Sequence, residues 1–426
     1  MRTLKNDSWK WRCRFSKTTN RNSRPCTSAL WFFAVLLILL TGQECGASPE
    51  TPKPKPPKTR VEIAPDSKSA RCNGVYAEAL EDLRVARDSL EELRVDGGKL
   101  GDADGFPTIN FTKLRLIIFK DIDGLTSEVL QYFGNQASVD ELQFDFCSFS
   151  GGFSKTLLAS FDKLKSLVLR GLDDLPRGVL CELESASLLD HVVVDSCEGV
   201  SDWILDDLAK LESVTHVGLI GINLATAKKT QWTKLNHISA WDFSFSKGIA
   251  ETCLPAFDGS YAIHSLNLTA IDGLDIEKDV AKIEKLMKIV GTLVNLKSLH
   301  LDLLSVNVAA LESLQPCGQL SVLSLGQCGV GDDALAALHR VGVAGRLTEL
   351  YVYSCSKVSD KGVSVLRSTE VLEGIDLTGT GVTKNSLSIL ANITTLKWAS
   401  VGHCNQLSDA DIDAFINKRH DVRVVR

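Results

Sequence analysis

The chain repeats one short apolar phrase along most of its length. An apolar anchor residue recurs thirteen times with a period of about 25 residues, which lies in the range of known repeat architectures. The anchors are Leu90, Leu114, Val139, Leu164, Leu189, Val214, Leu235, Ile263, Leu296, Leu320, Leu347, Leu372 and Leu396. Most are followed by apolar residues at +3, +5 and +8, as in Leu320, Leu323, Leu325 and Cys328. A period sustained from Leu90 to Leu396 predicts one elongated array of similar units instead of several globular domains.

Each unit is predicted to contain one strand and one helix. The apolar residues at +3 and +5 alternate with outward-facing neighbours, which is the period of a half-buried strand. After Cys355, Val358 continues the apolar face and Ser359 and Asp360 supply helix N-cap chemistry. A strand and a crossover helix in every unit require a parallel sheet, and stacking the units curves it. We therefore predict an α/β leucine-rich-repeat solenoid of about 13 repeats, a horseshoe with strands on the concave face and helices on the convex face.

A column of cysteines carries a resemblance to a known family. Cysteine occupies +8 in five units, as Cys147, Cys197, Cys328, Cys355 and Cys404. With the Val-Ser-Asp or Leu-Ser-Asp that follows in several units, this pattern resembles the cysteine-containing leucine-rich repeats of ubiquitin-ligase substrate receptors and of related bacterial exported proteins. The match is close from Leu320 to Asp409 and fair from Val139 to Asp202. Between Val214 and Leu304 it weakens, and the anchors are unevenly spaced there.

The resemblance implies a protein-binding scaffold without catalytic activity that takes its ligands on the concave face or its rim. The ligase receptors carry a helical F-box before their repeats, but the region before Leu90 offers only the helical segment from Val75 to Ser89. An F-box is therefore not predicted. We interpret residues 71–89 as an N-terminal capping helix and residues 90–426 as the repeat domain, with a C-terminal cap from about residue 411.

The N-terminal segment has the composition of an export signal. Met1–Ser28 holds eight basic residues against the single acidic residue Asp7, and the apolar run Ala29–Leu40 follows. That run has twelve residues, whereas a helix needs about 20 to cross a bilayer. We predict a signal peptide over residues 1–47, cleaved after Ala47, with an uncleaved membrane anchor as the alternative. Residues 48–70 are rich in Pro and Lys and are predicted to form a disordered linker.

Charge and motif content limit the function classes. The net charge of -6 gives no reason to expect nucleic acid, which usually requires a basic face. The sequence contains no GxSxG, no phosphate-binding glycine loop and no HExxH, so no enzyme activity and no cofactor are predicted. We expect an exported scaffold for a protein or a surface polymer, with membrane contact only through an uncleaved leader. The alternative is an intracellular substrate-receptor-like repeat protein of the ubiquitin-ligase type.

Nine cysteines remain after the predicted cleavage. We predict reduced thiols that pack in the core, and single cysteines one repeat apart exclude structural zinc on cysteine. Cys328 and Cys355 lie on neighbouring repeats, so a disulfide between them is the alternative to two reduced thiols. Glycosylation sequons begin at Asn110, Asn267 and Asn392. Asn267 falls on the predicted strand face, where a glycan would obstruct the sheet, so we interpret that sequon as a chance occurrence.

The concave face is predicted to carry the residues at +2, +4 and +6. These positions bring exposed aromatic and acidic side chains to one surface, as partner-binding sites tend to do. The predicted partner-binding residues are Glu349, Tyr351, Tyr353, Asp376 and Trp398, with Trp241 as an extension of the patch.

Three histidines form a second candidate site. His191, His216 and His237 take the +2 position of three consecutive units. Neighbouring parallel strands lie about 4.8 Å apart, so the imidazoles are predicted to stack in a row, with Asp195 close to it. Such a row is a candidate metal or pH-sensitive site. The alternative is that they are solvated histidines without a ligand.

Overall fold

The computed structural model describes residues 61–101, 103–136, 138–150, 158, 160–161, 163–173, 175–274 and 276–426. The chain divides into a unit Met1–Pro57 and a unit Lys58–Arg426, and every described residue belongs to the second. The predicted signal peptide, residues 1–47, and residues 48–60 of the predicted linker therefore lie outside the described residues. None of the helices that the structure describes is both long and apolar enough to span a bilayer.

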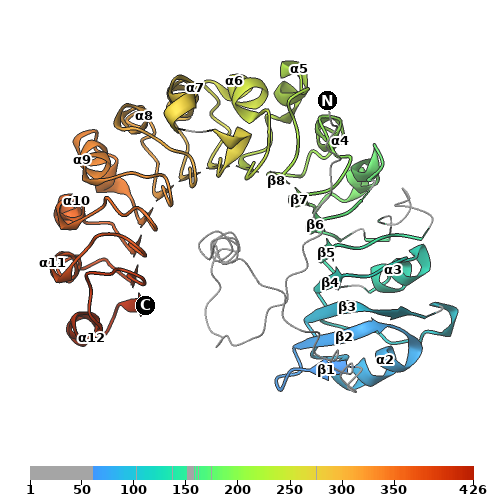
Figure 1. The fold of residues 1–426 in the computed structure, drawn as a ribbon. Coiled ribbons are helices and arrows are strands. Elements are labelled where there is room, and N and C mark those ends of the chain that lie inside the picture. The colour runs from blue at the N-terminus through green and yellow to red at the C-terminus, as the bar shows by residue number, and fades with distance from the viewer. Residues whose placement is uncertain are drawn as a thin grey trace, which may run out of the picture. The chain divides into compact units, whose positions relative to one another are not determined.

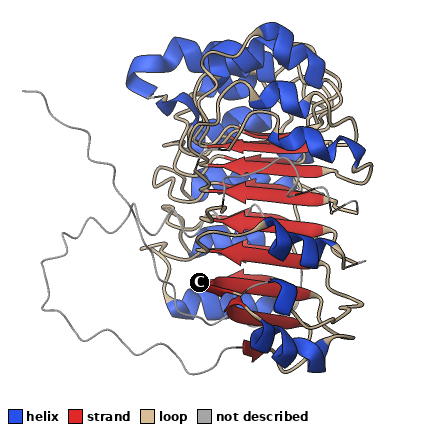
Figure 2. Cartoon of the chain, turned by 90° about the vertical axis from the view of Figure 1, so that its right-hand side faces the viewer, coloured by secondary structure: helices blue, strands red, loops and turns tan. Residues whose placement is uncertain are grey.

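One sheet runs through the whole array of repeats. Its sixteen strands stand in chain order, β1 and β2 pair antiparallel, and every later pair is parallel (Figure 2). The strands are β1 Val61–Ile63, β2 Ser69–Val75, β3 Glu92–Leu100, β4 Leu116–Lys120, β5 Glu141–Asp145, β6 Ser166–Arg170, β7 His191–Asp195, β8 His216–Ile220, β9 Ala240–Asp242, β10 Ser265–Asn267, β11 Ser298–His300, β12 Val322–Ser324, β13 Glu349–Tyr351, β14 Gly374–Asp376, β15 Trp398–Ser400 and β16 Arg423–Val425.

Helices cover the outer side of this sheet. The α-helices are α2 Ala77–Asp82, α3 Ser127–Gly134, α4 Ile204–Leu208, α5 Lys229–Trp232, α6 Leu254–Phe257, α7 Ile276–Val290, α8 Val308–Glu312, α9 Asp332–Arg340, α10 Asp360–Val363, α11 Lys384–Leu390 and α12 Asp409–Lys418. Shorter 3-10 and π turns are η1 Leu83–Ala86, η2 Ala103–Gly105, η3 Val179–Ser185, η4 Thr233–Leu235, η5 Ile249–Cys253, η6 Ile271–Gly273, η7 Ala344–Arg346 and η8 Ser364–Ser368.

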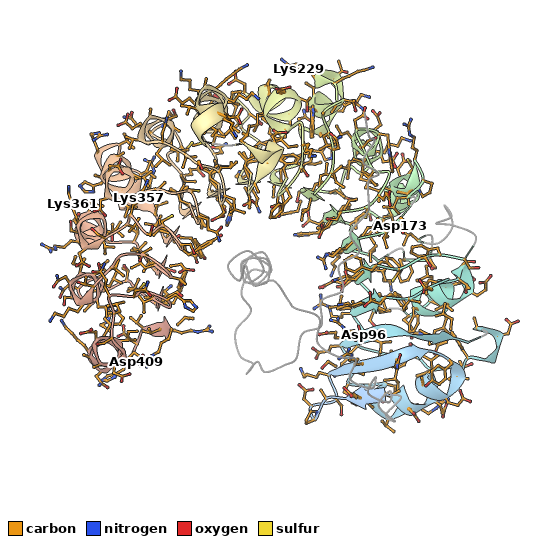
Figure 3. All side chains as sticks on the ribbon, in the orientation of Figure 1. Asp96, Asp173, Lys229, Lys357, Lys361 and Asp409 are labelled. Atoms are coloured by element: carbon orange, nitrogen blue, oxygen red, sulfur yellow. The ribbon has the colours of Figure 1, made fainter. Side chains whose placement is uncertain are left out.

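The array of repeats is an open arc with the strands inside and the helices outside (Figure 1). This confirms the predicted leucine-rich-repeat solenoid. Within the described residues, the thirteen parallel strands from β3 to β15 match the predicted number of repeats. Figure 3 shows Asp96 on the concave side, and Lys229 and Lys361 on the convex side.

The anchors and the +3 and +5 residues form one continuous core. Leu320, Leu323 and Leu325 are completely buried, and each belongs to the same apolar cluster as the equivalent residues of the neighbouring repeats. Burying one such side chain stabilises a fold by about 1.5–3 kcal/mol. A single unit has no partner for this apolar face, so the face is buried only when units stack.

The predicted anchor Leu235 is wrong by three positions. Gly218 of β8 pairs with Asp242 of β9, and this register makes Ile238 the equivalent of Val214. The interval from Val214 to Ile238 then nearly equals the interval from Ile238 to Ile263, so the uneven spacing on either side of Leu235 disappears. Leu235 instead ends η4 and is itself buried, which is why hydrophobicity did not distinguish the two residues.

A backbone signature supports the corrected register. The residue at +7 adopts a positive φ in repeat after repeat, for example Phe146 at 54°, Ser196 at 52° and Gln327 at 54°. Phe245, with φ of 61°, occupies +7 when Ile238 is the anchor. Non-glycine residues rarely adopt this conformation, so its recurrence at one position marks the end of each strand independently of side-chain type.

The N-terminal edge also differs from the prediction. Residues 61–70 were assigned to the disordered linker and residues 71–89 to a capping helix, but β1 and β2 form an antiparallel hairpin across this boundary. Ala70 and Cys72 alternate inward along β2, and helix α2 begins only at Ala77. The hairpin pairs with β3 and thereby covers the first edge of the sheet with backbone hydrogen bonds, which a helix does not supply.

Strand length changes along the arc. Strands β4 to β8 have five residues each, and β9 to β15 have three. In β9, β10 and β14 a polar side chain at +4 takes the backbone N–H of +6, as Asp242 Oδ1 accepts from Ser244 N at 2.9 Å. The carbonyl at +5 is bonded by a +8 side chain of the next repeat, as the Cys328 thiol donates to Leu301 O at 3.0 Å. The same +8 contact occurs beside the five-residue strand β6, where the Cys197 thiol donates to Leu169 O at 3.4 Å. Side chains thus pair buried backbone groups in both halves of the arc.

Candidate functional site on the concave face

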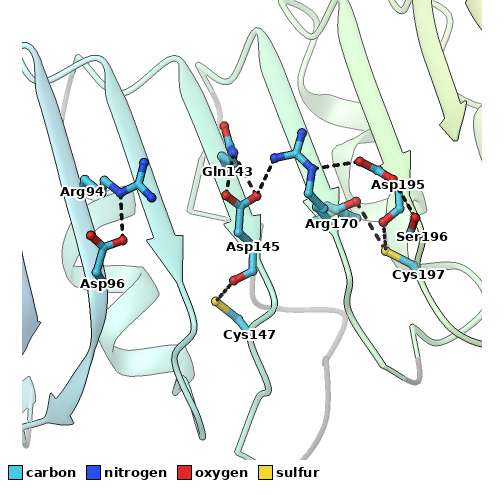
Figure 4. Close-up of polar contacts among 10 residues, drawn as sticks. Arg94, Asp96, Gln143, Asp145, Cys147, Arg170, Asp195, Ser196 and Cys197 are labelled. Atoms are coloured by element: carbon cyan, nitrogen blue, oxygen red, sulfur yellow. Dashed lines mark hydrogen bonds and ion pairs between the residues drawn. The ribbon is translucent and has the colours of Figure 1, made fainter. Parts of the chain in front are cut away.

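The N-terminal half of the concave face carries charged side chains that form ion pairs with one another. Arg170 of β6 lies between two carboxylates, with Nη1 at 3.0 Å from Asp145 Oδ1 and Nε at 2.9 Å from Asp195 Oδ2 (Figure 4). Gln143 also donates to Asp145 Oδ1, at 2.9 Å. The side chains of Asp145 and Asp195 are 10% and 3% exposed. Both carboxylates therefore make their hydrogen bonds within the protein. Asp195 was predicted to lie close to the histidine row, but it binds Arg170 instead.

The C-terminal half carries polar side chains that bind each other across neighbouring strands. Asp302 Oδ1 accepts from Ser324 Oγ and from Gly326 N, both at 2.6 Å. Asp302 Oδ2 is buried and has no hydrogen-bond partner among the residues that the structure describes. Asn267 Oδ1 accepts from Thr269 N at 3.0 Å in the same way. From β8 to β15 the +2, +4 and +6 positions contain no Lys or Arg.

Burial changes the acidity of the carboxyl groups in this half. Desolvation raises the pKa of Asp242, Asp302 and Asp376, because an ionised carboxylate loses more hydration than a neutral carboxyl group. Hydrogen bonds from Ser244, Ser324 and Thr378, respectively, offset part of this effect. These buried carboxyl groups therefore hold a proton more tightly than exposed ones do.

Two aromatic side chains meet on this half of the concave face. Tyr351 of β13 and Trp398 of β15 lie with their ring centroids 5.5 Å apart and their planes at 42°. The Trp398 indole extends across Gly374 of β14, where a Cβ atom would overlap the ring. Tyr351 donates its hydroxyl to Glu349 Oε2 at 2.6 Å. All three side chains are partly exposed, so the fold brings Glu349, Tyr351 and Trp398 together as predicted; we call them the aromatic patch.

Three other predicted partner-binding residues are buried. Trp241 is 2% exposed and packs against Trp232 and Phe243, because in the corrected register it occupies +3 and points inward. Tyr353 is 8% exposed, and its ring lies against Gly326, where a Cβ atom would overlap it. Burial raises the pKa of Tyr353. Asp376 is 5% exposed, so these three predictions of an accessible side chain are wrong.

The histidine row contains two of the three predicted members. His191 and His216 are direct neighbours in the sheet, and their rings stack with centroids 4.2 Å apart and planes at 10°. His237 precedes Ile238, and Ala240 takes the next place in the row, so the prediction for His237 is wrong. Asp190, which sequence reasoning missed, lies against both imidazoles. Its position directly before His191 was the available signal.

All nine cysteines of the described part are free thiols, and Cys181 alone among them is not buried. The Cys355 thiol donates to Leu325 O at 3.2 Å, which parallels the Cys328 contact with Leu301. Burial raises the pKa of both Cys328 and Cys355, and no disulfide joins them. Among the sequons, Asn267 is 7% exposed and its side chain is engaged within the protein, whereas Asn110 and Asn392 are exposed.

Comparison with known proteins adds little detail. No protein-family model matches the chain. No curated protein sequence matches it. Among solved structures, an internalin (InlF) of Listeria monocytogenes is 15% identical over 84% of this chain and 86% of its own, with a TM-score of 0.38. A leucine-rich-repeat protein of Leptospira interrogans is 13% identical over 83% of this chain and 93% of its own, with a TM-score of 0.43.

A third solved structure is TLR13 in complex with ssRNA13. It is 15% identical over 83% of this chain and 47% of its own length, with a TM-score of 0.49. All three scores are below 0.5, so the fold assignment rests on the strand order and register of this protein and not on these likenesses.

Proposed function

We propose that this protein is an exported, non-catalytic scaffold that binds a protein or a surface polymer on the concave face of β12 to β15. The observation that carries the proposal is the aromatic patch. Tyr351 and Trp398 present partly exposed rings that meet across one strand, and Gly374 leaves the space in which the indole lies. Buried interface centres are enriched in Tyr and Trp, because these side chains bring a large apolar area at a small cost in conformational entropy.

The surroundings of the patch favour a partner of low charge. The neighbouring polar groups of Ser324, Asp376 and Thr378 are buried and bonded within the sheet. Nucleic acid needs a basic surface, and the inner strand positions from β8 to β15 carry no Lys or Arg. RNA is the ligand in the TLR13 complex, but it is not proposed for this protein.

Export rests on the leader sequence, and one observation favours the alternative location. The cationic Met1–Ser28 followed by the apolar Ala29–Leu40 has the order of a signal peptide. The nine thiols in the described part are unpaired, which is usual in reducing compartments. That observation supports the second candidate, an intracellular substrate-receptor-like protein of the cysteine-containing repeat type.

A pull-down with purified protein tests the binding proposal. We expect Tyr351→Ala combined with Trp398→Ala to abolish capture of the partner that the unchanged protein retains. Tyr261→Ala is the matched control, because Tyr261 is a 72% exposed aromatic residue outside the strands. Circular dichroism checks that all variants are folded. Equal capture by the double variant and the control would exclude the aromatic patch as the binding site.

A reporter fusion separates the two locations. Residues 1–60 are joined to a reporter enzyme that is active only outside the cytoplasm. Activity supports export, and a fusion that stays inactive while accumulating in the cytoplasm supports the intracellular alternative.

A further inference from the structure

Three side chains lie together on the concave face, where strands β7 and β8 begin. His191 and His216 occupy the first positions of β7 and β8, and Asp190 directly precedes β7. Asp190 Oδ2 lies 3.0 Å from His191 Nδ1 and 3.4 Å from His216 Nδ1. One potential ligand atom from each residue lies within 4.8 Å of the other two. Among the described residues no other group of His, Cys, Asp and Glu meets this criterion.

These separations match those around a bound metal ion. Zinc bonds to His nitrogen and carboxylate oxygen measure about 2.0–2.2 Å, which puts neighbouring ligand atoms about 3.3–3.5 Å apart in a tetrahedron. The two imidazoles stack almost in parallel, so binding one ion requires the rings to rotate out of this stack. Their side chains are 50% and 45% exposed, which leaves room on the solvent side for that rotation. Two imidazoles and one carboxylate are a donor set suited to zinc and similar transition metals and poorly suited to Mg²⁺ or Ca²⁺.

The surroundings hold the three ligands in place. The Thr215 hydroxyl lies 2.8 Å from His216 Nδ1, a contact that an ion bound at that nitrogen would replace. It also donates to Asp190 Oδ1, which orients this carboxylate beside the two rings. Hydrogen bonds of this kind orient metal ligands and increase their affinity. The strand pairing of His191 with His216 fixes the separation of the two side chains. Two rigid strands and one short connection therefore supply the site.

Two carboxylates act on the His191 imidazole, those of Asp190 and Glu141. Desolvation and the neighbouring His216 lower the pKa of His191, against the opposing effect of Asp190 and Glu141. Glu141, the nearest further carboxylate, is held by Arg115 at 3.2 Å. Glu141 is therefore engaged by a cation, and Asp190 is the carboxylate that contacts both imidazoles.

We propose that Asp190, His191 and His216 bind one divalent transition-metal ion, with Zn²⁺ as the representative ligand. Three protein ligands leave a coordination position open toward the concave face for water or for a donor group of a bound molecule. The site lies on β7 and β8, whereas the aromatic patch lies on β13 to β15. The metal proposal therefore stands independently of the proposed partner-binding function.

Isothermal titration of the full chain with Zn²⁺ at pH 7.5 tests the proposal. We expect one binding event that is at least about tenfold weaker in His191→Ala, in His216→Ala and in Asp190→Asn. His339→Ala is the matched control, because this exposed histidine of α9 lies outside the site. Mg²⁺ should produce no such event. Zn²⁺ binding with the same affinity in the unchanged protein and all three site variants would overturn the proposal, as would absence of binding.

A second measurement locates the ion and does not depend on variants. Diethyl pyrocarbonate modifies accessible imidazoles, and mass spectrometry identifies the modified residue. Zn²⁺ should protect His191 and His216 at pH 7.5 but leave His339 reactive. Equal modification of His191 and His216 with and without Zn²⁺ would exclude the site.

Discussion

Asp302 shows how an acidic residue on the solvent side of a sheet becomes a buried group. It occupies the +6 position, yet its side chain is completely buried and bonds to Ser324 and Gly326 of the next repeat. One carboxylate oxygen has no hydrogen-bond partner among the described residues. Burial removes hydration from the ionised carboxylate, and this desolvation raises the pKa of Asp302, although the Ser324 hydrogen bond and the nearby His300 favour the charged form.

This raised pKa predicts how stability depends on pH. The folded state holds the proton more tightly than the unfolded chain, whose Asp pKa is about 3.9. The stabilising contribution is therefore complete below that pH and is lost as the pH rises through the folded-state pKa. Asp302→Asn retains an acceptor for Ser324 and removes the charge, so we expect a higher free energy of unfolding than the unchanged protein at pH 8 and convergence of the two near pH 4.

Urea denaturation at pH 4, 6 and 8 measures this difference. Asp173→Asn serves as the control, because Asp173 is an exposed aspartate outside the strands and its substitution should leave stability nearly unchanged at each pH. An Asp302→Asn variant that is less stable than the unchanged protein at pH 8 would show that the ionised carboxylate is stabilised by groups other than those described.

At the level of single residues, the outcome of the candidate-site predictions depended on register for some residues and on contacts between repeats for others. The patterns around Leu347 and Leu396 are regular, so Tyr351 and Trp398 were placed correctly on one surface. The choice of Leu235 in place of Ile238 turned the inward Trp241 outward. Hydrophobicity cannot separate two buried apolar residues three positions apart. The burial of Tyr353 depends on Gly326 of the preceding repeat, and a sequence pattern within one repeat does not contain that contact.

At the scale of elements, the Ser-Asp and Thr-containing turns do more than begin a helix. Ser359 and Thr383 are the N-cap residues of α10 and α11, as the pattern predicts for Ser359. Asp360 instead binds the following repeat: its carboxylate accepts from Thr383 N at 2.9 Å and from Thr383 Oγ1 at 2.6 Å. It also accepts from Ser386 N at 3.2 Å. The start of α11 is thus tied to the start of the helix before it.

Removing this link should destabilise the protein. Asp360→Ala leaves the backbone donors of Thr383 and Ser386 without their acceptor, and we expect a loss of about 1–3 kcal/mol in the free energy of unfolding. Burial alone would raise the pKa of Asp360, but hydrogen bonds from Ser386, Thr383 and Asn385 outweigh it and lower the pKa. The contribution of Asp360 is therefore present above the unfolded-state pKa and is lost as the pH falls through the lower folded-state pKa.

Guanidinium denaturation of Asp360→Ala at pH 7 and at pH 3 measures both effects. The difference from the unchanged protein should be largest at pH 7 and smaller at pH 3. Glu370→Ala, a change at an exposed acidic residue of the same repeat, should alter stability by less than about 0.5 kcal/mol. A difference for Asp360→Ala that does not shrink at pH 3 would argue against the charge-assisted link.

At the scale of the whole array of repeats, the fold could be predicted because the same pattern recurs in each repeat. The wrong anchor Leu235 affected the prediction for one repeat only. The other repeats still predict the same architecture. The two ends lack this redundancy. The β1–β2 hairpin occurs once and has no period, and the boundary between the predicted linker and the predicted capping helix falls inside β2. Edge protection is set by backbone pairing, which leaves a weaker signal in the sequence than core packing does.

This redundancy predicts that one whole repeat can be removed. Deletion of residues 347–371 takes away one complete repeat and brings Leu372 into the place of Leu347; both anchors are completely buried. Strand β14 then meets β12 in the register that β13 now occupies, because Leu323 pairs with Leu350 and Leu350 with Ile375. We expect a folded protein with a lower melting temperature and one cooperative transition by circular dichroism.

A matched deletion separates register from length. Removing residues 351–371 takes away less of the chain than the whole repeat, but it puts Leu372 at +4 of the Leu347 unit and turns that anchor toward solvent. One apolar layer is then lost, and the strands and helices beyond the junction have no continuous core on which to stack. This shorter deletion should lose far more structure than the longer one. Equal melting curves for the two deletions would show that the units do not depend on a shared register.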